Sequence, residues 1–133
     1  MSDPIPPAIQ SPTSAILRFS LILGGVSGAC GVTLMALAAH LDTTGLLSTA
    51  AQMLLFHAPV IIGLGVLTQV RRAPFAPIAI LLLVAGLGLF SGDLASRALT
   101  DQRLFANSAP TGGMLLIAGW LATALSALRL KER

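Results

Sequence analysis

Five polar side chains have the chemistry that a functional site could use. They are two imidazoles, one carboxylate, one amide and one hydroxyl, from His40, His57, Asp93, Gln52 and Thr111. An imidazole can donate or accept a hydrogen bond or bind a metal ion, and a carboxylate inside a membrane can carry a proton. We take these five residues as the candidate polar or ligand-binding site.

His57 lies near the middle of Leu46–Gln69, a stretch without a permanent charge. At about 1.5 Å per helical residue this stretch can cross a hydrocarbon core of about 30 Å. A polar ring at that depth needs a partner, because an unsatisfied polar group in hydrocarbon costs several kcal/mol. Pro59 predicts a kink beside the ring. The partner of His57 must come from another apolar segment or from a bound molecule.

Asp93 is the one carboxylate expected inside an apolar segment, near the end of that segment. An acid at such a place suggests a function by default, as a proton carrier or ligand. Arg97 follows four residues later, however, where it can pair with Asp93 along a helix. The sequence leaves both interpretations open, a salt bridge or hydrogen bond at the membrane interface and a proton or ligand site.

Four apolar segments must position these residues. Only 10% of the 133 residues are charged, against about a quarter in a typical soluble domain. Each segment reaches or approaches the ~20 residues of a membrane crossing. The segments are Ile16–Ala39, Leu46–Gln69, Phe75–Ser96 and Thr111–Leu128. We predict an all-α bundle of four transmembrane helices over residues 14–133, preceded by a disordered proline-rich tail, residues 1–13.

The basic residues are unevenly distributed between the two sides of such a bundle. Six of them fall near the amino end, in the second loop or at the carboxyl end, which share one side of the membrane. The other two, Arg97 and Arg103, fall on the opposite side. The positive-inside rule therefore predicts that both termini are cytoplasmic. Four of the six should meet lipid headgroups at the membrane surface, namely Arg71, Arg72, Arg129 and Lys131. With no Tyr and one Trp to stack on bases, nucleic acid is not an expected partner.

Several kinds of chemistry find no support in the sequence. A single cysteine, Cys30, excludes an intramolecular disulfide and a cysteine metal cluster. His40 is expected at the surface and His57 about 15 Å deep, from ~1.5 Å per residue, so we predict no metal site and no cofactor. No nucleophile beside a base and no phosphate-binding loop is recognisable. We predict that the protein is not an enzyme.

Small residues recur at helical spacing and predict close helix packing, because small side chains let helix backbones approach in lipid. Ser20, Gly24 and Gly28 form one such stripe. The complete set of predicted packing glycines is Gly24, Gly28, Gly88, Gly92, Gly112, Gly113 and Gly119. The pair at the start of the fourth segment could alternatively bind an anion at a helix amino end.

Several short motifs resemble those of the YgdD-like family of small bacterial inner-membrane proteins. The resemblance covers about residues 16–131. Its motifs are Ala38-Ala39-His40, Phe56-His57-Ala58, Leu89-Phe90-Ser91-Gly92, Pro110-Thr111-Gly112-Gly113 and Gly119-Trp120. It implies four spans and an inner-membrane location, and it implies no biochemical activity.

Three functional hypotheses remain. The first is a non-catalytic accessory or assembly subunit that packs against a larger membrane complex, with membrane lipids and a membrane-protein partner or a second copy as its contacts. The second is a lipid- or quinone-binding protein that uses the kink at His57 and Pro59. The third is a small proton-coupled transporter that uses Asp93.

Overall fold

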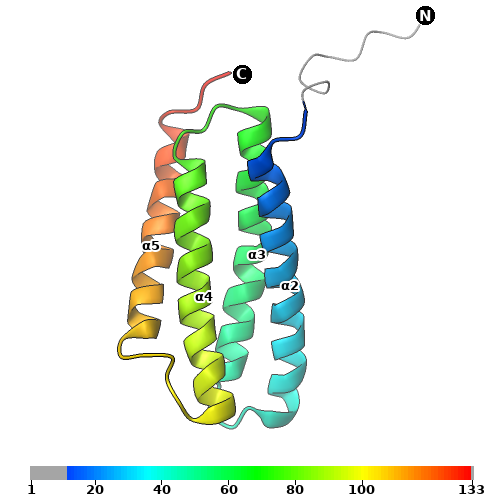
Figure 1. Cartoon of the computed structure of the whole chain (residues 1–133), viewed down its shortest axis with the longest axis vertical. Coiled ribbons are helices and arrows are strands. Elements are labelled where there is room, and N and C mark those ends of the chain that lie inside the picture. Colours follow the sequence, from blue (N-terminus) through cyan, green and yellow to red (C-terminus); the bar gives the residue numbers. More distant parts are fainter. Residues whose placement is uncertain (1–11, 133) are drawn as a thin grey trace, which may run out of the picture.

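The computed structural model describes residues 12–132, which form four long helices running alternately in opposite directions (Figure 1). The helices are α2 (Ala15–Leu41), α3 (Leu46–Val70), α4 (Ala76–Thr100) and α5 (Ser108–Ala127). Each is long and apolar enough to cross a bilayer, which confirms the predicted all-α class with four spanning helices. α2 begins and α5 ends at the same end of the bundle, which we call the termini end. Residues 1–11, most of the predicted tail, and residue 133 lie outside the described residues.

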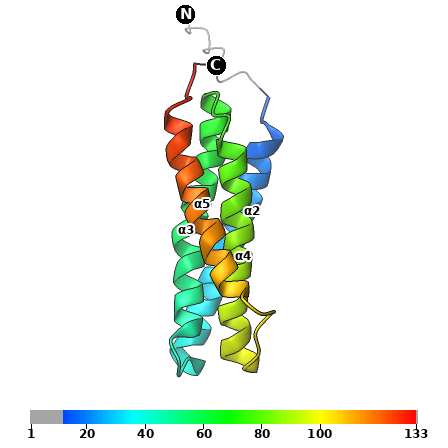
Figure 2. The ribbon, with the colours of Figure 1, turned by 90° about the vertical axis from the view of Figure 1, so that its left-hand side faces the viewer.

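The helices pack in chain order. α2 lies on α3, α3 on α4, and α4 on α5, whereas α2 and α4 touch each other at few points. Figure 2 shows the bundle from the side of α5. The core lies mainly between α3 and α4, where Ile61, Leu83 and Leu87 are almost fully buried. In an apolar 18-residue window of each helix, 44% of the α4 window is buried inside the bundle, against 11% of the α2 window. α2 is therefore a peripheral helix that leaves most of its surface to its surroundings.

The connection between α4 and α5 is shorter than the sequence predicts. α4 continues to Thr100 instead of ending near Ser96, and α5 begins at Ser108, so the loop covers residues 101–107. Asp101 and Asn107 end and begin these helices with left-handed backbone conformations, at φ 59° and 66°. Short polar side chains tolerate that conformation better than most residues, which explains a tight loop without glycine.

The start of α5 also differs from the prediction. Pro110 is accommodated inside the first turn because amides there have no intrahelical acceptor. Thr111 lies after it, and its N–H donates to the carbonyl of Asn107 over 3.0 Å. Asn107 is the N-cap, and its side chain makes no capping hydrogen bond.

Asp42 closes the connection between α2 and α3. Its carboxylate accepts hydrogen bonds from the N–H groups of Thr44 at 3.2 Å, Gly45 at 2.8 Å and Ser48 at 2.7 Å. The Ser48 amide belongs to the first turn of α3, where it would otherwise lack an acceptor. That bond is the main cause that lowers the pKa of Asp42 below its ordinary value. Gly45 takes a left-handed conformation, at φ 78°, which glycine adopts without a steric cost.

Glycines bring helix backbones into contact at two interfaces. Between α4 and α5, a Cβ added to Gly112 would stand 2.8 Å from the carbonyl oxygen of Gly86. A Cβ on Gly119 would stand 2.8 Å from the Leu83 side chain, and one on Gly24 would meet the backbone and a side chain of α3. These positions have no room for a larger residue, and Gly86 was not among the predicted packing glycines.

The other predicted packing glycines are looser. A Cβ on Gly28 or Gly113 would make ordinary contacts at 3.8 Å, and one on Gly92 would lie 3.3 Å from the loop side chain of Leu104. A Cβ on Gly88 would meet nothing within 4 Å. Packing at Gly88 would therefore have to involve another molecule.

Candidate functional site

His57 is buried on α3 and has both ring nitrogens in hydrogen bonds. Nδ1 lies 2.7 Å from the carbonyl oxygen of Met53, one turn earlier. Trp120 of α5 donates its indole N–H to Nε2 over 3.1 Å. Because an indole can only donate, Nε2 must be the acceptor, which leaves the proton on Nδ1 facing Met53. The partner of His57 is thus within the chain.

The same pair also makes a ring contact. The rings of His57 and Trp120 meet edge to face, with centroids 5.9 Å apart and planes inclined by 62°. Trp120 is 47% exposed while His57 is 5% exposed, so the indole covers the imidazole and faces the surroundings with its other side. The contact joins α5 to α3, two helices that otherwise hardly touch.

Asp93 is buried on α4 at the far end of the bundle from the termini. Its Oδ1 accepts hydrogen bonds from the Ser108 hydroxyl and from the Leu104 N–H, the latter over 3.0 Å. Its Oδ2 lies 3.8 Å from a guanidinium nitrogen of Arg97, the pair that the four-residue spacing predicts. The carboxylate therefore fastens the α4–α5 loop and the first turn of α5 onto α4.

The structure does not bring the five candidate residues together. His57 and Asp93 have separate sets of partners and share none of them. His40, Gln52 and Thr111 are exposed. In residues 12–132 no group of three His, Cys, Asp or Glu side chains lies close enough to hold a metal ion. The candidate residues therefore form two separate polar contacts between helices, which we call polar ties: His57 with Trp120, and Asp93 with Ser108.

Two functional contacts were missed at the sequence level, those of Trp120 and Ser108. In the sequence, Trp120 stands out only in the motif Gly119-Trp120, and Ser108 belongs to none of the motifs. A donor-only indole and a mid-span imidazole in one small bundle could have been paired by their matching chemistry. Ser108 could not be paired with Asp93 without knowing where α5 begins.

An apolar groove runs between α2 and α4 over α3, in the half of the bundle away from the termini. We call it the distal groove; its volume is about 460 Å³. The lining residues are mostly small or aliphatic: Ala29, Cys30, Thr33, Leu34, Leu54, Leu87, Gly88, Ser91, Gly92 and Ala95. The Thr33 hydroxyl donates to the Ala29 carbonyl, but the buried Ser91 hydroxyl has no partner within residues 12–132.

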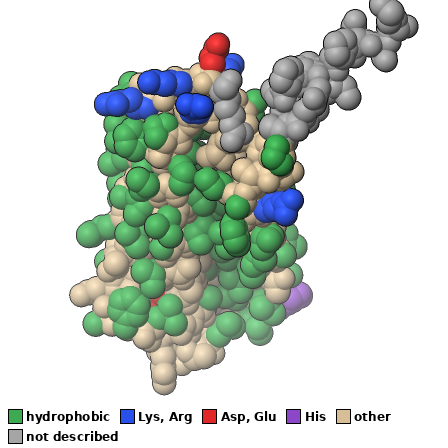
Figure 3. All heavy atoms as spheres, turned by 45° about the horizontal axis from the view of Figure 1, so that its top comes forward, with side chains coloured by type: hydrophobic (Ala, Val, Ile, Leu, Met, Phe, Trp, Pro, Cys, Tyr) green, Lys and Arg blue, Asp and Glu red, His purple; other side chains and the backbone are tan. Residues whose placement is uncertain are grey.

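The termini end of the bundle carries the basic surface. Figure 3 shows Lys and Arg side chains gathered there, above sides that are largely hydrophobic. Arg71 and Arg72 come from the α3–α4 turn, and Arg129 and Lys131 from the segment after α5. This distribution matches that of a protein embedded in lipid, with charges at one headgroup level.

These features define a small four-helix membrane protein in which His57 links α3 to α5 and Asp93 links α4 to the start of α5. The chain belongs to the family described as "Protein of unknown function (DUF423)", whose model matches residues 20–113. It is 37% identical over 123 residues to the UPF0382 inner membrane protein YgdD of Escherichia coli strain K12. That match covers 87% of this chain and 94% of the relative.

The protein of the same name from Shigella flexneri matches to the same extent. No solved structure matches the chain. The resemblance to the YgdD-like family is therefore confirmed, and so is the inner-membrane location, because the relatives are named inner membrane proteins and four helices can span a bilayer. Neither the family description nor the names of these relatives indicate a catalytic activity.

Proposed function

We propose that this protein is a non-catalytic accessory subunit of a larger membrane complex and that it receives a transmembrane helix of a partner in the distal groove. The observation that carries the proposal is the groove itself. Both of its walls are lined by small residues, and Gly88 stands open. Helices associate in lipid mainly through such close backbone approach, since no hydrophobic drive separates them from the acyl chains.

Two further observations support a helix as the occupant. Ser91 and Ala95 add small side chains to the α4 wall of the groove, and small residues let a neighbouring helix backbone approach closely in membranes. α2 contributes little to the core, so this wall of the groove is free to face a neighbour. A partner helix would cover the part of the bundle that the chain's own helices leave uncovered.

The two alternative functions receive less support. A quinone or lipid at His57 would have to displace the indole of Trp120 or the Met53 carbonyl. A proton carrier at Asp93 would have to break its bonds to Ser108 and to the α4–α5 loop. Both groups already have structural roles in the isolated chain.

The proposal includes the orientation of the bundle. Both ends of the helical domain lie at the termini end, which is also the basic end, and the positive-inside rule assigns such an end to the cytoplasm. A Lys131→Cys variant in a Cys30→Ser background tests this assignment. An impermeant thiol reagent added to intact cells should leave the new cysteine unlabelled, and labelling from outside would contradict the orientation.

Photo-crosslinking in native membranes tests the partner helix. A photo-reactive phenylalanine derivative at Cys30 lies in the groove, and the same derivative at Phe56, an exposed residue outside the groove, is the matched control. We expect a discrete protein adduct from position 30 only. Crosslinks to lipid alone, or to a second copy alone, would overturn the proposal.

A substitution that fills the distal groove provides a second test of the partner helix. Gly88→Leu places a side chain in the groove without a clash, and Gly63→Leu places one in open space elsewhere on the bundle. We expect Gly88→Leu to abolish the adduct and to lower the amount of the intact partner complex, whereas Gly63→Leu leaves both unchanged. Equal effects of the two variants would contradict a role for the groove.

A further inference from the structure

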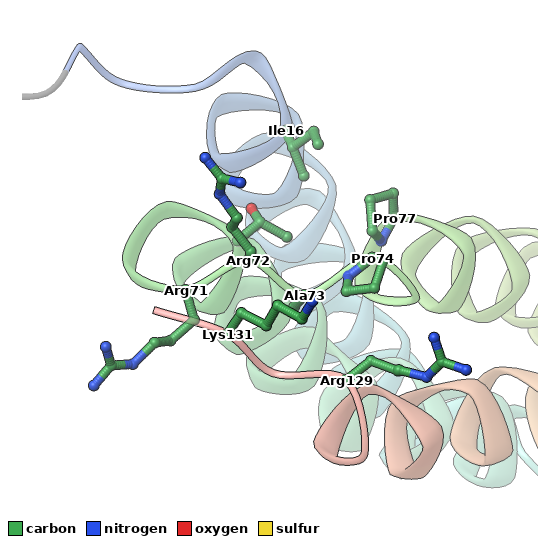
Figure 4. Close-up of a pocket in the computed structure, with 9 residues that line it drawn as sticks. Ile16, Arg71, Arg72, Ala73, Pro74, Pro77, Arg129 and Lys131 are labelled. Atoms are coloured by element: carbon green, nitrogen blue, oxygen red, sulfur yellow. The ribbon is translucent and has the colours of Figure 1, made fainter. Parts of the chain in front are cut away.

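A second pocket lies at the termini end, opposite in character to the distal groove. It has a volume of about 550 Å³ and lies between the first turn of α2, the α3–α4 turn and the segment after α5 (Figure 4). Four cationic residues and a hydroxyl line it together with apolar residues. The lining residues are Ile16, Thr68, Arg71, Arg72, Ala73, Pro74, Pro77, Arg129 and Lys131.

Backbone pairing builds this basic pocket. Arg72 and Lys131 exchange two backbone hydrogen bonds, Arg72 N–H to Lys131 carbonyl at 3.0 Å and the reverse at 3.2 Å. This bridge holds the segment after α5 against the α3–α4 turn. Lys131 extends toward Ala73, with Arg72 on one side and Arg129 on the other, while Arg71 points away (Figure 4).

Among the described residues, 12–132, no carboxylate pairs with the cations of the pocket. The ion pair of Asp93 and Arg97 is the only one within residues 12–132, and it lies at the other end of the bundle. Glu132 is exposed beside Lys131 and is not paired with it. Three cations around one pocket, with no carboxylate paired to them within residues 12–132, favour a phosphate, to which guanidinium and ammonium groups donate charge-assisted hydrogen bonds.

An apolar groove adjoins the pocket on the side toward the middle of the bundle. This proximal groove, of about 210 Å³, lies between α2 and α4 and shares Ile16 and Pro77 with the basic pocket. The rest of its lining is almost entirely apolar: Phe19, Ser20, Leu23, Ile80, Leu81 and Val84. A free phosphate would use only the basic part, whereas a lipid would use both parts.

We propose that the basic pocket and the proximal groove together bind one anionic glycerophospholipid. Its phosphate lies among Arg72, Arg129 and Lys131, and one acyl chain runs between α2 and α4. An apolar groove beside the cations, with Ile16 and Pro77 lining both cavities, favours a lipid over a soluble anion, and basic pockets between membrane helices are suited to such headgroups. The site lies in the other half of the bundle from the distal groove, so it stands independently of the proposed function.

Native mass spectrometry of the full chain, purified in mild detergent, tests the site with phosphatidylglycerol as the probe. Phosphatidylcholine is the control for charge, and glycerol 3-phosphate and inorganic phosphate are the controls for the acyl chains. We expect one retained phosphatidylglycerol that neither soluble anion displaces. Equal retention of phosphatidylcholine, or displacement by either soluble anion at similar concentration, would overturn the proposal.

Variants separate this site from general attraction to anionic lipid. Arg72→Gln combined with Lys131→Gln should weaken phosphatidylglycerol retention about 25-fold, from about fivefold for each charge near a membrane surface. Arg18→Gln removes an exposed charge of α2 that does not line the pocket and should change retention less than twofold. If the double variant does not fold, Arg129→Gln alone should give the fivefold loss. Equal losses from the pocket variants and Arg18→Gln would contradict a defined site.

Discussion

Glycines have opposite roles in two regions of the bundle: the interface between α4 and α5, which we call the seam, and the side between α2 and α4, which we call the face. At the seam, Gly86 and Gly112 bring two backbones together, and Gly119 receives the Leu83 side chain. On the α2–α4 face, Gly88 stands open and the two helices hardly touch. The seam closes the bundle on one side, and the face leaves two grooves on the other.

This difference shows that a glycine at helix-packing spacing does not reveal its partner. Glycines within the seam are satisfied by the chain and contribute to the stability of the monomer. Gly88 on the face contacts nothing inside the chain, so it is available to lipid or to another helix. Substitutions in the two regions should therefore have opposite consequences.

The largest expected effect lies in the seam. Gly112→Ala forces a Cβ to within 2.8 Å of the Gly86 carbonyl oxygen and against the backbone at Phe90. Overpacking of this kind should cost about 3 kcal/mol of the free energy of unfolding. Gly88→Ala on the face should be neutral or stabilising by up to about 1 kcal/mol, because alanine is the better helix former. Unfolding in mixed micelles measures both, and similar losses would erase the distinction between the regions.

The next effect concerns the polar tie at the far end of the seam. Asp93→Ala leaves the Leu104 N–H and the Ser108 hydroxyl without their acceptor, at a cost of about 2 kcal/mol. Asp93→Asn keeps one acceptor oxygen and should lose about half as much. Limited proteolysis should cut loop 101–107 faster in the alanine variant. Unchanged cleavage in both variants would show that Asp93 does not hold the loop.

A smaller effect is expected where α5 meets α3. Trp120→Phe keeps an aromatic ring but removes the donor to His57. Side-chain hydrogen bonds between membrane helices average about 0.6 kcal/mol, and we expect a loss of that size. A double-mutant cycle with His57→Leu isolates the interaction. A coupling energy of zero would mean that the seam and α3 are joined by packing alone.

The smallest effect concerns the α2–α3 connection beside the open face. The pKa of Asp42 is lower in the folded protein than in the unfolded chain, where it is near 4. The ionised carboxylate therefore stabilises the fold above the unfolded pKa, and this contribution disappears as the pH falls through the lower folded pKa. The stability difference between the wild type and Asp42→Asn should be present at pH 7 and shrink below pH 4. A difference that does not change with pH would argue against the carboxylate as the cap of α3.

Much of the fold could be predicted from local patterns. The pairing of Asp93 with Arg97, one of the two roles left open for that carboxylate, followed from their spacing along one helix. The predicted start of the fourth segment, Thr111, lies three residues after the observed start of α5 at Ser108, because the first turn of a helix accepts Pro110.

The sequence by itself determined that the chain forms four membrane-spanning helices with a basic end, because apolar length and charge distribution are local properties. Only the tertiary structure decided that His57 meets Trp120, that Asp93 meets Ser108, and that Gly86 is closed while Gly88 is open. Those pairings depend on how each helix is rotated and shifted against its neighbour. Apolar helices in lipid carry no strong amphipathic pattern that would fix this rotation in advance.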